Sequence, residues 1–406
     1  MSAAKPDARL AELIDLLAGS RQHIDEWFAA EFAKQHPPFY ASVDIRVSSH
    51  KMAPVDVNLF PGGFNNLDAA AIERAAGAAG GMLERAWPGS KRLLVLAEAH
   101  TRNPHYVDNL AVLGRMLEMA GVEVRFACLG AEPLEVSGSD GKSLHLASIC
   151  RRGRRIEAAG FDPDALLLNN DLAAGTPKML LDIEQPKLPP LAAGWSQRRK
   201  SAYFFQYERV ATRFAHEFGF DPWLIDAFFN VCTRVDVARK VGMDCLAAAV
   251  AETLDDIRSN FAGIGSEERP FVVIKADAGT YGMGVVMLDE ADQVHSLNRR
   301  QRSSLASGKD GLTISDILIQ EGIPTIELVD GFAAEEAHYC VGDKVIGSFW
   351  RFNQRKSDRE NLNSQGMGFA CRPESEAANA RRQASETVAA LALLAAGREF
   401  AGDLAA

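Results

Sequence analysis

Apolar runs and amphipathic stretches alternate along the chain from about residue 92 onward. The apolar run 93–99 predicts a buried strand, residues 106–119 have helical spacing, and residues 122–129 predict a second strand. A further strand is expected in 165–175, where an apolar run leads into two asparagines and an aspartate. This order predicts an α/β domain around a parallel sheet, in which ligands gather at the carboxyl ends of the strands.

The region before these strands combines a predicted helix with an irregular polar stretch. Near the amino end, Leu10, Leu13 and Leu17 share one helical face, which predicts a helix that docks on the core. Residues 45–68 are rich in Asn, Gly and Pro, and we expect them to form a long loop. Loops of this kind often bind ligands.

The second half begins at a proline-rich segment, 184–194, where we place a domain boundary. Helical stretches are expected from there to about residue 260, followed by a mixed region of strands and loops. The expected elements are strands 271–277, 337–341 and 344–352, a tight turn at Gly342-Asp343, a closing helix in 374–400 and, in the first half, a hairpin over 134–146.

Length and composition narrow the class of protein. A chain of 406 residues suggests two or three domains, and its 47% apolar content suffices for packed cores of that size. The net charge of −10 argues against a general nucleic-acid binder. Since no apolar run approaches the roughly 18 residues that span a bilayer, and the amino end lacks a signal-peptide pattern, we expect a soluble, cytoplasmic protein with no membrane partner. Oligomeric state is left open.

Several familiar motifs fail. The GKS at 141–143 lacks the P-loop glycine, because Val136 stands in its place, and neither GxGxxG nor GxSxG occurs. His100 and His105 are separated by Pro104 and do not form the one-face pair of a zinc helix. The six cysteines show no CxxC spacing and lie in apolar segments, so we interpret them as core thiols in a reducing compartment.

Residues 271–285 carry the strongest chemical signal. An apolar strand holds Lys275 near its end and leads into a loop with Gly279, Gly282 and Gly284. Glycines let backbone N–H groups approach polyanionic oxygens, and a neighbouring lysine adds a positive charge. The pattern fits a phosphate-binding loop, which we call the phosphate cradle. A strand followed by a glycine-rich hairpin without a ligand would have the same sequence pattern.

Other polar segments point in the same direction. The acidic total conceals two basic clusters, within 194–213 and 351–359, which suit a triphosphate and a small carboxylate. The first holds Lys200 at the start of a helical segment. The apolar strand in 317–327 breaks at Gln320-Glu321-Gly322, where backbone groups could meet an adenine edge, and DRENLNSQG at 358–366 offers an arginine and two asparagines. A solvated basic surface, a plain strand end and a polar loop remain the alternatives.

In their order these pieces resemble the ATP-grasp ligases, in which a nucleotide lies between two α+β lobes. Further, KMAPVDVNLFPGGFNNL, AEAHTRNPHY, LLNNDLAAG and GWSQRRKS closely resemble segments of a proteobacterial type of glutamate–cysteine ligase, and this likeness covers most of the chain. It implies an amino-terminal α/β substrate domain at 1–190, an ATP-grasp lobe with the glycine loop at 191–317, and a second lobe with the closing helix at 318–406.

The resemblance also implies a reaction and a set of site residues. ATP would phosphorylate the side-chain carboxylate of glutamate, and the amine of cysteine would displace phosphate to give γ-glutamylcysteine, the first step of glutathione biosynthesis, with Mg²⁺ as cofactor. Arg351, Arg359 and Lys275 would be catalytic. ATP would contact Lys200, Lys275, Gly279, Thr280, Tyr281, Gly282, Met283, Gly284, Gln320, Glu321 and Ile323. The residues themselves add a candidate site for a zwitterion: Arg46, Lys51, Arg102 and Arg351 could hold carboxylates, and Asp56, Asn58, Asn65, Asn66 and Asp171 could hold an ammonium group, although Asn and Asp are also common in turns.

One departure concerns the metal. ATP-grasp enzymes usually carry a late Glu-x-Asn as magnesium ligands, and this chain ends after a helix without one. Glu335, Asn361 and Asn363 are therefore taken as the metal ligands, with Glu327, Glu336 and Glu360 as further candidates. Two alternatives stay open: an ATP-grasp ligase for another amino acid and amine, and a nucleotide-binding regulatory protein without turnover.

Overall fold

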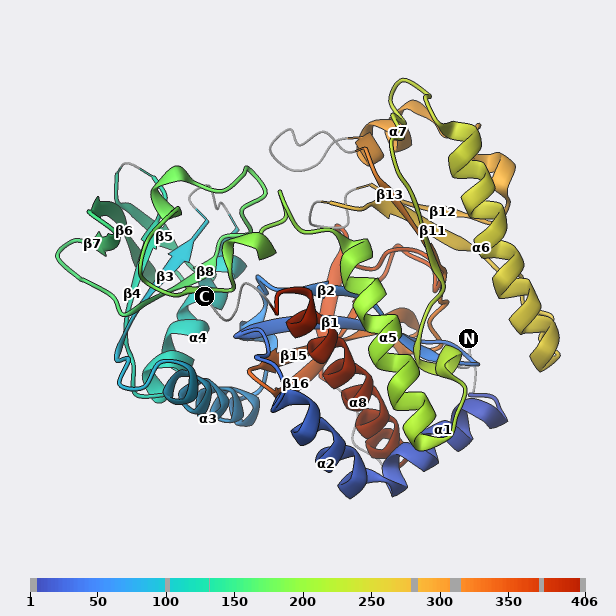
Figure 1. The fold of residues 1–406 in the computed structure, drawn as a ribbon, viewed down its shortest axis with the longest axis horizontal. Coiled ribbons are helices and arrows are strands. Elements are labelled where there is room, and N and C mark those ends of the chain that lie inside the picture. The colour runs from blue at the N-terminus through green and yellow to red at the C-terminus, as the bar shows by residue number, and fades with distance from the viewer. Residues whose placement is uncertain are drawn as a thin grey trace.

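A computed structural model describes residues 6–98, 103–130, 132–278, 284–306, 315–371 and 376–401. These residues form three sheets, with a six-stranded sheet lying between the other two (Figure 1). The helices are α1 (Ala8–Gly19), α2 (Arg21–Phe32), α3 (Ala69–Ala86), α4 (Pro104–Met119), α5 (Lys200–Phe218), α6 (Met243–Ile264), α7 (Arg299–Ala306) and α8 (Glu376–Glu399). The predicted mixture of α/β and α+β parts is confirmed.

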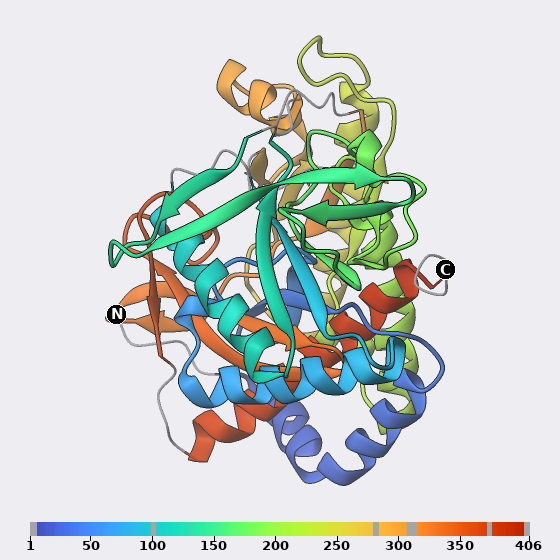
Figure 2. The ribbon, with the colours of Figure 1, turned by 90° about the vertical axis from the view of Figure 1, so that its left-hand side faces the viewer.

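The seven-stranded sheet forms one end of the molecule, which faces the viewer in Figure 2. Its strands run in the order β5-β6-β4-β3-β8-β9, with β7 paired to β6, and β3 pairs in parallel with β4 and β8. Leu93 and Val95 of β3 face one hydrophobic cluster, while Leu94 and Leu96 face the other. Because both faces are buried, the strand reads as a continuous apolar run. The bounds are β3 (Arg92–Ala97), β4 (Glu123–Cys128), β5 (Leu134–Ser137), β6 (Ser143–Arg152), β7 (Arg155–Ala158), β8 (Ala165–Asn169) and β9 (Lys187–Leu188).

The six-stranded antiparallel sheet draws on both ends of the chain. Its order is β17-β16-β15-β1-β2, with β14 paired to β15, so an amino-terminal hairpin completes a carboxyl-terminal sheet. The bounds are β1 (Tyr40–Val47), β2 (Met52–Asn58), β14 (Leu328–Val329), β15 (Phe332–Val341), β16 (Lys344–Asn353) and β17 (Met367–Ala370). The three contiguous domain ranges stay a prediction, and the sheet itself joins residues from the first and the last of them.

The hairpin corrects the expectation of a long loop over 45–68. Pro54 lies within β2 and hid the strand in the sequence, but β2 is at the edge of the sheet, where a proline leaves no ladder hydrogen bond unmade. A bulge between Asp44 and Ile45 also breaks the regular alternation of β1. Residues after Asn58 are irregular apart from a short 3-10 helix, Phe64–Asn66.

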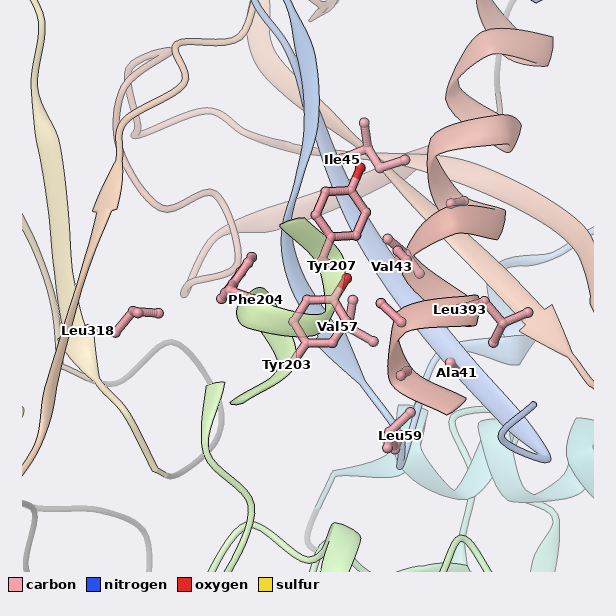
Figure 3. Packing of buried hydrophobic residues seen from close by; sticks show 14 of the residues in the cluster. Ala41, Val43, Ile45, Val57, Leu59, Tyr203, Phe204, Tyr207, Leu318 and Leu393 are labelled. Atoms are coloured by element: carbon pink, nitrogen blue, oxygen red, sulfur yellow. The ribbon is translucent and has the colours of Figure 1, made fainter. Parts of the chain in front are cut away.

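Helices α5 and α8 pack together beneath this sheet. In Figure 3, Val43 and Ile45 of β1 and Val57 of β2 meet Tyr203 and Tyr207 of α5, with Leu393 of α8 beside them. An ion pair reinforces the packing, because buried Arg198 donates to both carboxylate oxygens of Glu399 at the end of α8 and to the carbonyl of Val57 at 2.7 Å. The predicted closing helix is thereby tied to the hairpin.

The four-stranded antiparallel sheet, ordered β10-β13-β11-β12, lies at the other end of the molecule under α6 and α7. Its strands are β10 (Phe229–Cys232), β11 (Val272–Ala276), β12 (Val285–Leu288) and β13 (Ile317–Glu321). Gly284, the last glycine of the predicted cradle, has φ +75°, and a Cβ there would collide with the carbonyl of Ser304 in α7. Glycine is therefore required where the loop rejoins the sheet.

Smaller predictions also have outcomes. The hairpin expected over 134–146 is confirmed as β5 and β6, and the single docking helix is instead two helices, α1 and α2. The cysteine interpretation holds for Cys128, Cys232 and Cys340, which are buried, and is wrong for the exposed Cys150, Cys245 and Cys371. No helix in the described ranges is long and apolar enough to cross a membrane.

Candidate active site

The predicted phosphate lysines lie where the four-stranded and six-stranded sheets meet. Lys275 extends from β11 and donates to the carbonyl of Val55 in β2 at 2.8 Å. Its pKa is lowered by burial, and the positive charge of Arg46 adds to the effect. A buried ammonium group with one carbonyl acceptor has unused donors, which suits it to bind an anionic oxygen.

Lys200 reaches the same region from the first turn of α5. Its backbone N–H donates to the carbonyl of Asp277 at 2.9 Å, and its ammonium lies 3.7 Å from the centre of the Trp195 ring. Burial, together with the nearby positive charges of Lys275 and Arg198, lowers the pKa of Lys200 to about 8. The carboxylate of Asp277 caps this helix start by accepting from the backbone N–H and hydroxyl of Ser201, both at 2.7 Å.

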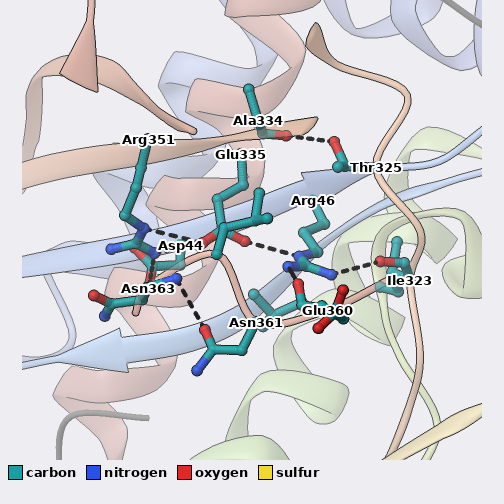
Figure 4. A network of polar contacts seen from close by, with 12 residues as sticks. Asp44, Arg46, Ile323, Thr325, Ala334, Glu335, Arg351, Glu360, Asn361 and Asn363 are labelled. Atoms are coloured by element: carbon teal, nitrogen blue, oxygen red, sulfur yellow. Dashed lines mark hydrogen bonds and ion pairs between the residues drawn. The ribbon is translucent and has the colours of Figure 1, made fainter. Parts of the chain in front are cut away.

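A second group of charges is buried across β1, β15 and β16 (Figure 4). We call Asp44, Arg46, Glu335 and Arg351 the four-charge network. Arg351 donates to Glu335 at 2.7 Å and to Asp44 at 2.5 Å, and Arg46 donates to the second oxygen of Glu335 at 2.8 Å. Each carboxylate therefore meets a guanidinium in a largely buried region, where Glu335 is 3% and Asp44 15% exposed.

The two carboxylates of the network respond differently to burial. Burial raises the pKa of Asp44 to about 6, although Arg351 opposes the change. Burial would also raise the pKa of Glu335, but Arg46 and Arg351 on either side hold it below its ordinary value. The structure thus favours the ionised form of Glu335 and disfavours that of Asp44, so a further cation beside Asp44 would lower its pKa again.

The network also holds the loop that carries the predicted DRENLNSQG motif. Arg46 donates to the carbonyl of Glu360 at 2.5 Å and to that of Ile323 at 3.3 Å. Asn353, fully buried at the end of β16, donates to the hydroxyl of Ser364 at 3.2 Å and accepts from the backbone N–H of Arg355. We call the segment Gln320–Ile323 at the end of β13 the hinge. Arg46 therefore anchors both the hinge and the loop 358–366.

At the hinge, two residues predicted to bind different ligands bind each other. Lys51 of the β1–β2 turn donates to Glu321 at 2.8 Å, and both side chains are buried. Glu321 also accepts from the Trp223 indole at 3.2 Å and from the backbone N–H of Phe228 at 3.0 Å. Burial keeps the pKa of Lys51 below its ordinary value even beside this partner. Both side chains are thereby committed to a structural tie between the hairpin and β13.

The residues flanking Glu321 remain suited to a ligand. Gln320 is buried, and its Nε2 has no hydrogen-bond partner among the described residues. The hydroxyl of Tyr203 in α5 is likewise buried without a described partner. Gly322 admits no side chain, because a Cβ would lie 2.2 Å from the Phe271 ring. Orphaned buried donors of this kind ordinarily find a partner, and a bound molecule can supply one.

Asp56 links the lysines to the four-charge network. It pairs directly opposite Asp44 in the β1–β2 ladder. Its negative charge opposes the lowering of the pKa of Lys200 and Lys275 that burial causes, and it adds to the raised pKa of Asp44. Two carboxylates opposite each other on neighbouring strands repel, which favours a cation between them.

Most of the remaining predicted residues make structural contacts away from the four-charge network, and some lie outside the described residues. Arg359 lies apart from the four-charge network, donating to Asp289 beyond β12 at 2.7 Å and stacking on Phe271. Asn58 and Asp171 accept from the backbone N–H groups of Phe60 and Ala173, so both shape their own turns. Asn65 and Asn66 are half-buried in the 3-10 helix, and Asn361 accepts from the backbone N–H of Asn363 at 3.0 Å. Arg102 and Gly279, Thr280, Tyr281, Gly282 and Met283 lie outside the described residues.

Asp44, Asp277, Trp195 and Asn353 were not predicted as site residues. The bulge after Asp44 interrupts the alternation of β1, so the sequence pattern did not show which way Asp44 faces. Asp277 could have been noticed, because it lies two residues after Lys275. In the part of the chain that the structure describes, no three His, Cys, Asp or Glu side chains come together in a way that could hold a metal ion.

Comparisons with known proteins show the family and the fold. The family profile GshA, glutamate-cysteine ligase, matches residues 15–400. A crystal structure of a candidate gamma-glutamylcysteine synthetase from Methylobacillus flagellatus KT is 38% identical, with a TM-score of 0.90 over 97% of this chain and 96% of that one. D-alanyl-alanine synthetase A from Vibrio cholerae aligns at 10% identity over 74% of this chain and 80% of that one, with a TM-score of 0.37, too low to carry an argument. Among curated proteins no match was found.

The Lys51–Glu321 pair gives a prediction about stability. Lys51→Met should lower the free energy of unfolding by about 3–5 kcal/mol, because it leaves a buried carboxylate without its cation. Adding Glu321→Gln should recover part of the loss by removing that charge. Urea unfolding followed by circular dichroism measures both.

Lys34→Met is the matched control. Lys34 also forms an ion pair, with Glu31, but its side chain is 65% exposed compared with 2% for Lys51. We expect a change of at most about 1 kcal/mol. Equal losses for the two lysine variants would contradict the structural role of the buried pair.

Proposed function

The chain belongs to the glutamate–cysteine ligase family, and from this and the site geometry we propose that it joins L-glutamate to L-cysteine at the expense of ATP. The γ-carboxylate of glutamate takes the terminal phosphoryl group of ATP, and the cysteine amine then displaces phosphate to give γ-glutamylcysteine and ADP. The observation that carries the proposal is the meeting of Lys200, Lys275 and the four-charge network around Asp56.

The chemistry requires neutralisation of charge more than it requires a nucleophile on the protein. A carboxylate resists attack by an amine because oxide is a poor leaving group, and phosphorylation converts that oxygen into phosphate. Phosphoryl transfer is catalysed mainly by positioning and by cations around the transferring group. The absence of GxSxG from the sequence and the buried lysines and arginines described above support this type of reaction.

For ATP, we assign the phosphates to Lys200, Lys275 and the glycine loop from Gly279 to Gly284. The adenine ring is assigned to the hinge at Gln320–Ile323, where the unpaired Nε2 of Gln320 supports a bound hydrogen-bond acceptor. The side chain of Glu321 is not part of this assignment, because Lys51, Trp223 and Phe228 already occupy it. Backbone groups of the hinge remain suited to an adenine edge.

For magnesium, we assign Asp56 and Asp44 as the protein ligands. Mg²⁺ prefers oxygen ligands and is commonly held by one or two carboxylates together with substrate phosphates. The opposed carboxylates of β1 and β2 fit that pattern, and bound Mg²⁺ would supply charge neutralisation at the phosphates. The sequence-based candidate Glu335 fits less well, since Arg46 and Arg351 bind both of its oxygens, whereas Arg351 binds one oxygen of Asp44. Asn361 and Asn363 remain candidates for an outer position beside the loop.

For the amino acids, we propose that Arg351 binds the glutamate carboxylate that accepts the phosphoryl group. Arg351 lies next to Asp44 and close to Asn363 (Figure 4). Arg46 acts through Glu335 and the loop, and is a positioning residue. Arg359, Arg102, Asn58, Asn65, Asn66 and Asp171 remain candidates for holding glutamate or cysteine. We further propose that the enzyme works in the cytoplasm, where cysteine and ATP are available together.

The direct test is ADP release by the purified protein with Mg²⁺ and ATP. We expect release when L-glutamate and L-cysteine are both present, and only background with either one alone. Mass spectrometry should identify γ-glutamylcysteine as the product. Turnover with another amine but not cysteine would indicate a different ligase, and bound ATP without turnover for any pair would indicate a regulatory nucleotide-binding protein.

The lowered pKa of Lys200 predicts how ATP affinity changes with pH. The free protein loses the proton of Lys200 above a pH of about 8, whereas a bound triphosphate requires the ammonium form. Affinity should therefore fall by about fivefold between pH 8 and pH 9, with proton uptake on binding. Calorimetry with a non-hydrolysable ATP analogue in two buffers of different ionisation enthalpy measures both quantities.

Lys200→Arg is the control, because guanidinium stays protonated throughout this range. Its affinity should change little between pH 8 and pH 9. A wild-type affinity that is flat over this interval, or the same loss in the arginine variant, would contradict the assignment of Lys200 to the phosphates.

A further inference from the structure

Two cysteines of the four-stranded sheet region lie in direct contact. The sulfur of Cys232, at the end of β10, is 3.0 Å from the sulfur of Cys245, in the first turn of α6. Cys232 is 1% exposed, whereas Cys245 is exposed to solvent. Since a disulfide has a sulfur separation of about 2.05 Å, the two sulfurs lie about 1 Å beyond bonding distance.

The surroundings divide the two sulfurs into distinct roles. Burial, together with the contact with Cys245, raises the pKa of the Cys232 thiol to about 12. Cys232 is thus protected from reagents in solution, while Cys245 is accessible. A surface pocket lies at the same helix start and is lined by Lys240, Gly242, Met243, Asp244 and His295. Lys240 in this pocket can bind the carboxylate of a small ligand.

We propose that Cys232 and Cys245 are a reversible redox site, which closes to a disulfide when it reacts with a low-molecular-weight disulfide. The exposed thiol is the site of attack and the buried thiol resolves the product. Sulfur contact, unequal exposure and the adjoining pocket carry the proposal together. It goes beyond the ligase reaction, since neither cysteine belongs to the residues assigned to that reaction.

The exchange balances as two thiol–disulfide steps. The Cys245 thiolate attacks one sulfur of glutathione disulfide, which breaks that S–S bond, releases one glutathione thiolate and leaves a mixed disulfide on Cys245. Cys232 then gives up its proton and attacks the Cys245 sulfur, which releases the second glutathione. Two protein thiols are oxidised by two electrons, and one glutathione disulfide is reduced to two glutathione molecules.

The disulfide would attach α6 to β10, which pairs with β13, the strand that leads to the proposed adenine hinge. Strand β10 pairs with β13 in the register Phe229 with Gln320 and Cys232 with Ile317. A disulfide would join the start of α6 to this pair of strands covalently. The oxidised protein should therefore have a more stable nucleotide lobe, because the cross-link restricts the unfolded chain.

The test uses the full-length protein equilibrated with glutathione and glutathione disulfide at several ratios. After quenching with N-ethylmaleimide and digestion, mass spectrometry should find the Cys232 peptide joined to the Cys245 peptide, about 2 Da lighter than the reduced pair. Dithiothreitol should reverse the link. The oxidised protein should melt at a higher temperature than the reduced protein.

Three variants keep the result interpretable. Cys150→Ser removes an exposed cysteine elsewhere, and should leave the link and the rise in melting temperature unchanged. Cys245→Ser should abolish both and leave Cys232 reduced, whereas Cys232→Ser should stop at the mixed disulfide on Cys245. The proposal is overturned if wild-type Cys245 accumulates only as the mixed disulfide, if the link forms only under denaturing conditions, or if no ratio produces it.

Discussion

Charges buried between two sheets must be matched within the protein or by a ligand, and this constraint organises the whole site. Glu335 is ionised between two arginines, and Lys51 is matched by Glu321. These matched groups fix the hairpin, the hinge and the loop 358–366 relative to one another. The groups at the centre are matched less well. The pKa values of Lys200, Lys275 and Asp44 are shifted, and Asp44 faces the carboxylate of Asp56.

The imperfect matching at the centre is what suits it to a substrate. Burial disfavours the charged forms of both lysines and of Asp44 in the free protein. A triphosphate with magnesium would supply negative charge to the lysines and positive charge to the carboxylates at the same time. Binding would therefore improve several buried interactions at once, which is an effective way to orient a phosphoryl group.

The position of the amino-terminal hairpin has a consequence for the metal. Residues 318–406 contain no Glu-x-Asn of the kind expected in an ATP-grasp lobe. Strand β2, which carries Asp56 and Asn58, lies instead at the edge of the sheet formed by the last strands, above α8. Acidic residues of the amino-terminal hairpin thus share a sheet with β15, β16 and β17, and we propose that they take the place of that motif.

The sequence was most informative where one local rule decides the structure. Continuous apolar runs identified the parallel strands, and glycines next to Lys275 identified a loop that requires Gly284. Prediction failed where distant residues decide. Pro54 and a bulge concealed the hairpin, and nothing local to Lys51 or Glu321 indicates that they pair across 270 positions. The candidate residues were therefore found largely through motifs, while their partners required the fold.

The central claim is that glutamate is activated as an acyl phosphate, and the fate of the carboxylate oxygens tests it most directly. Glutamate labelled with oxygen-18 in its γ-carboxylate should be incubated with the enzyme, ATP, Mg²⁺ and cysteine, and the phosphate released should be analysed by mass. The account predicts one labelled oxygen in each phosphate, because the oxygen that attacks ATP leaves with the phosphoryl group. Unlabelled phosphate alongside normal formation of γ-glutamylcysteine would contradict it.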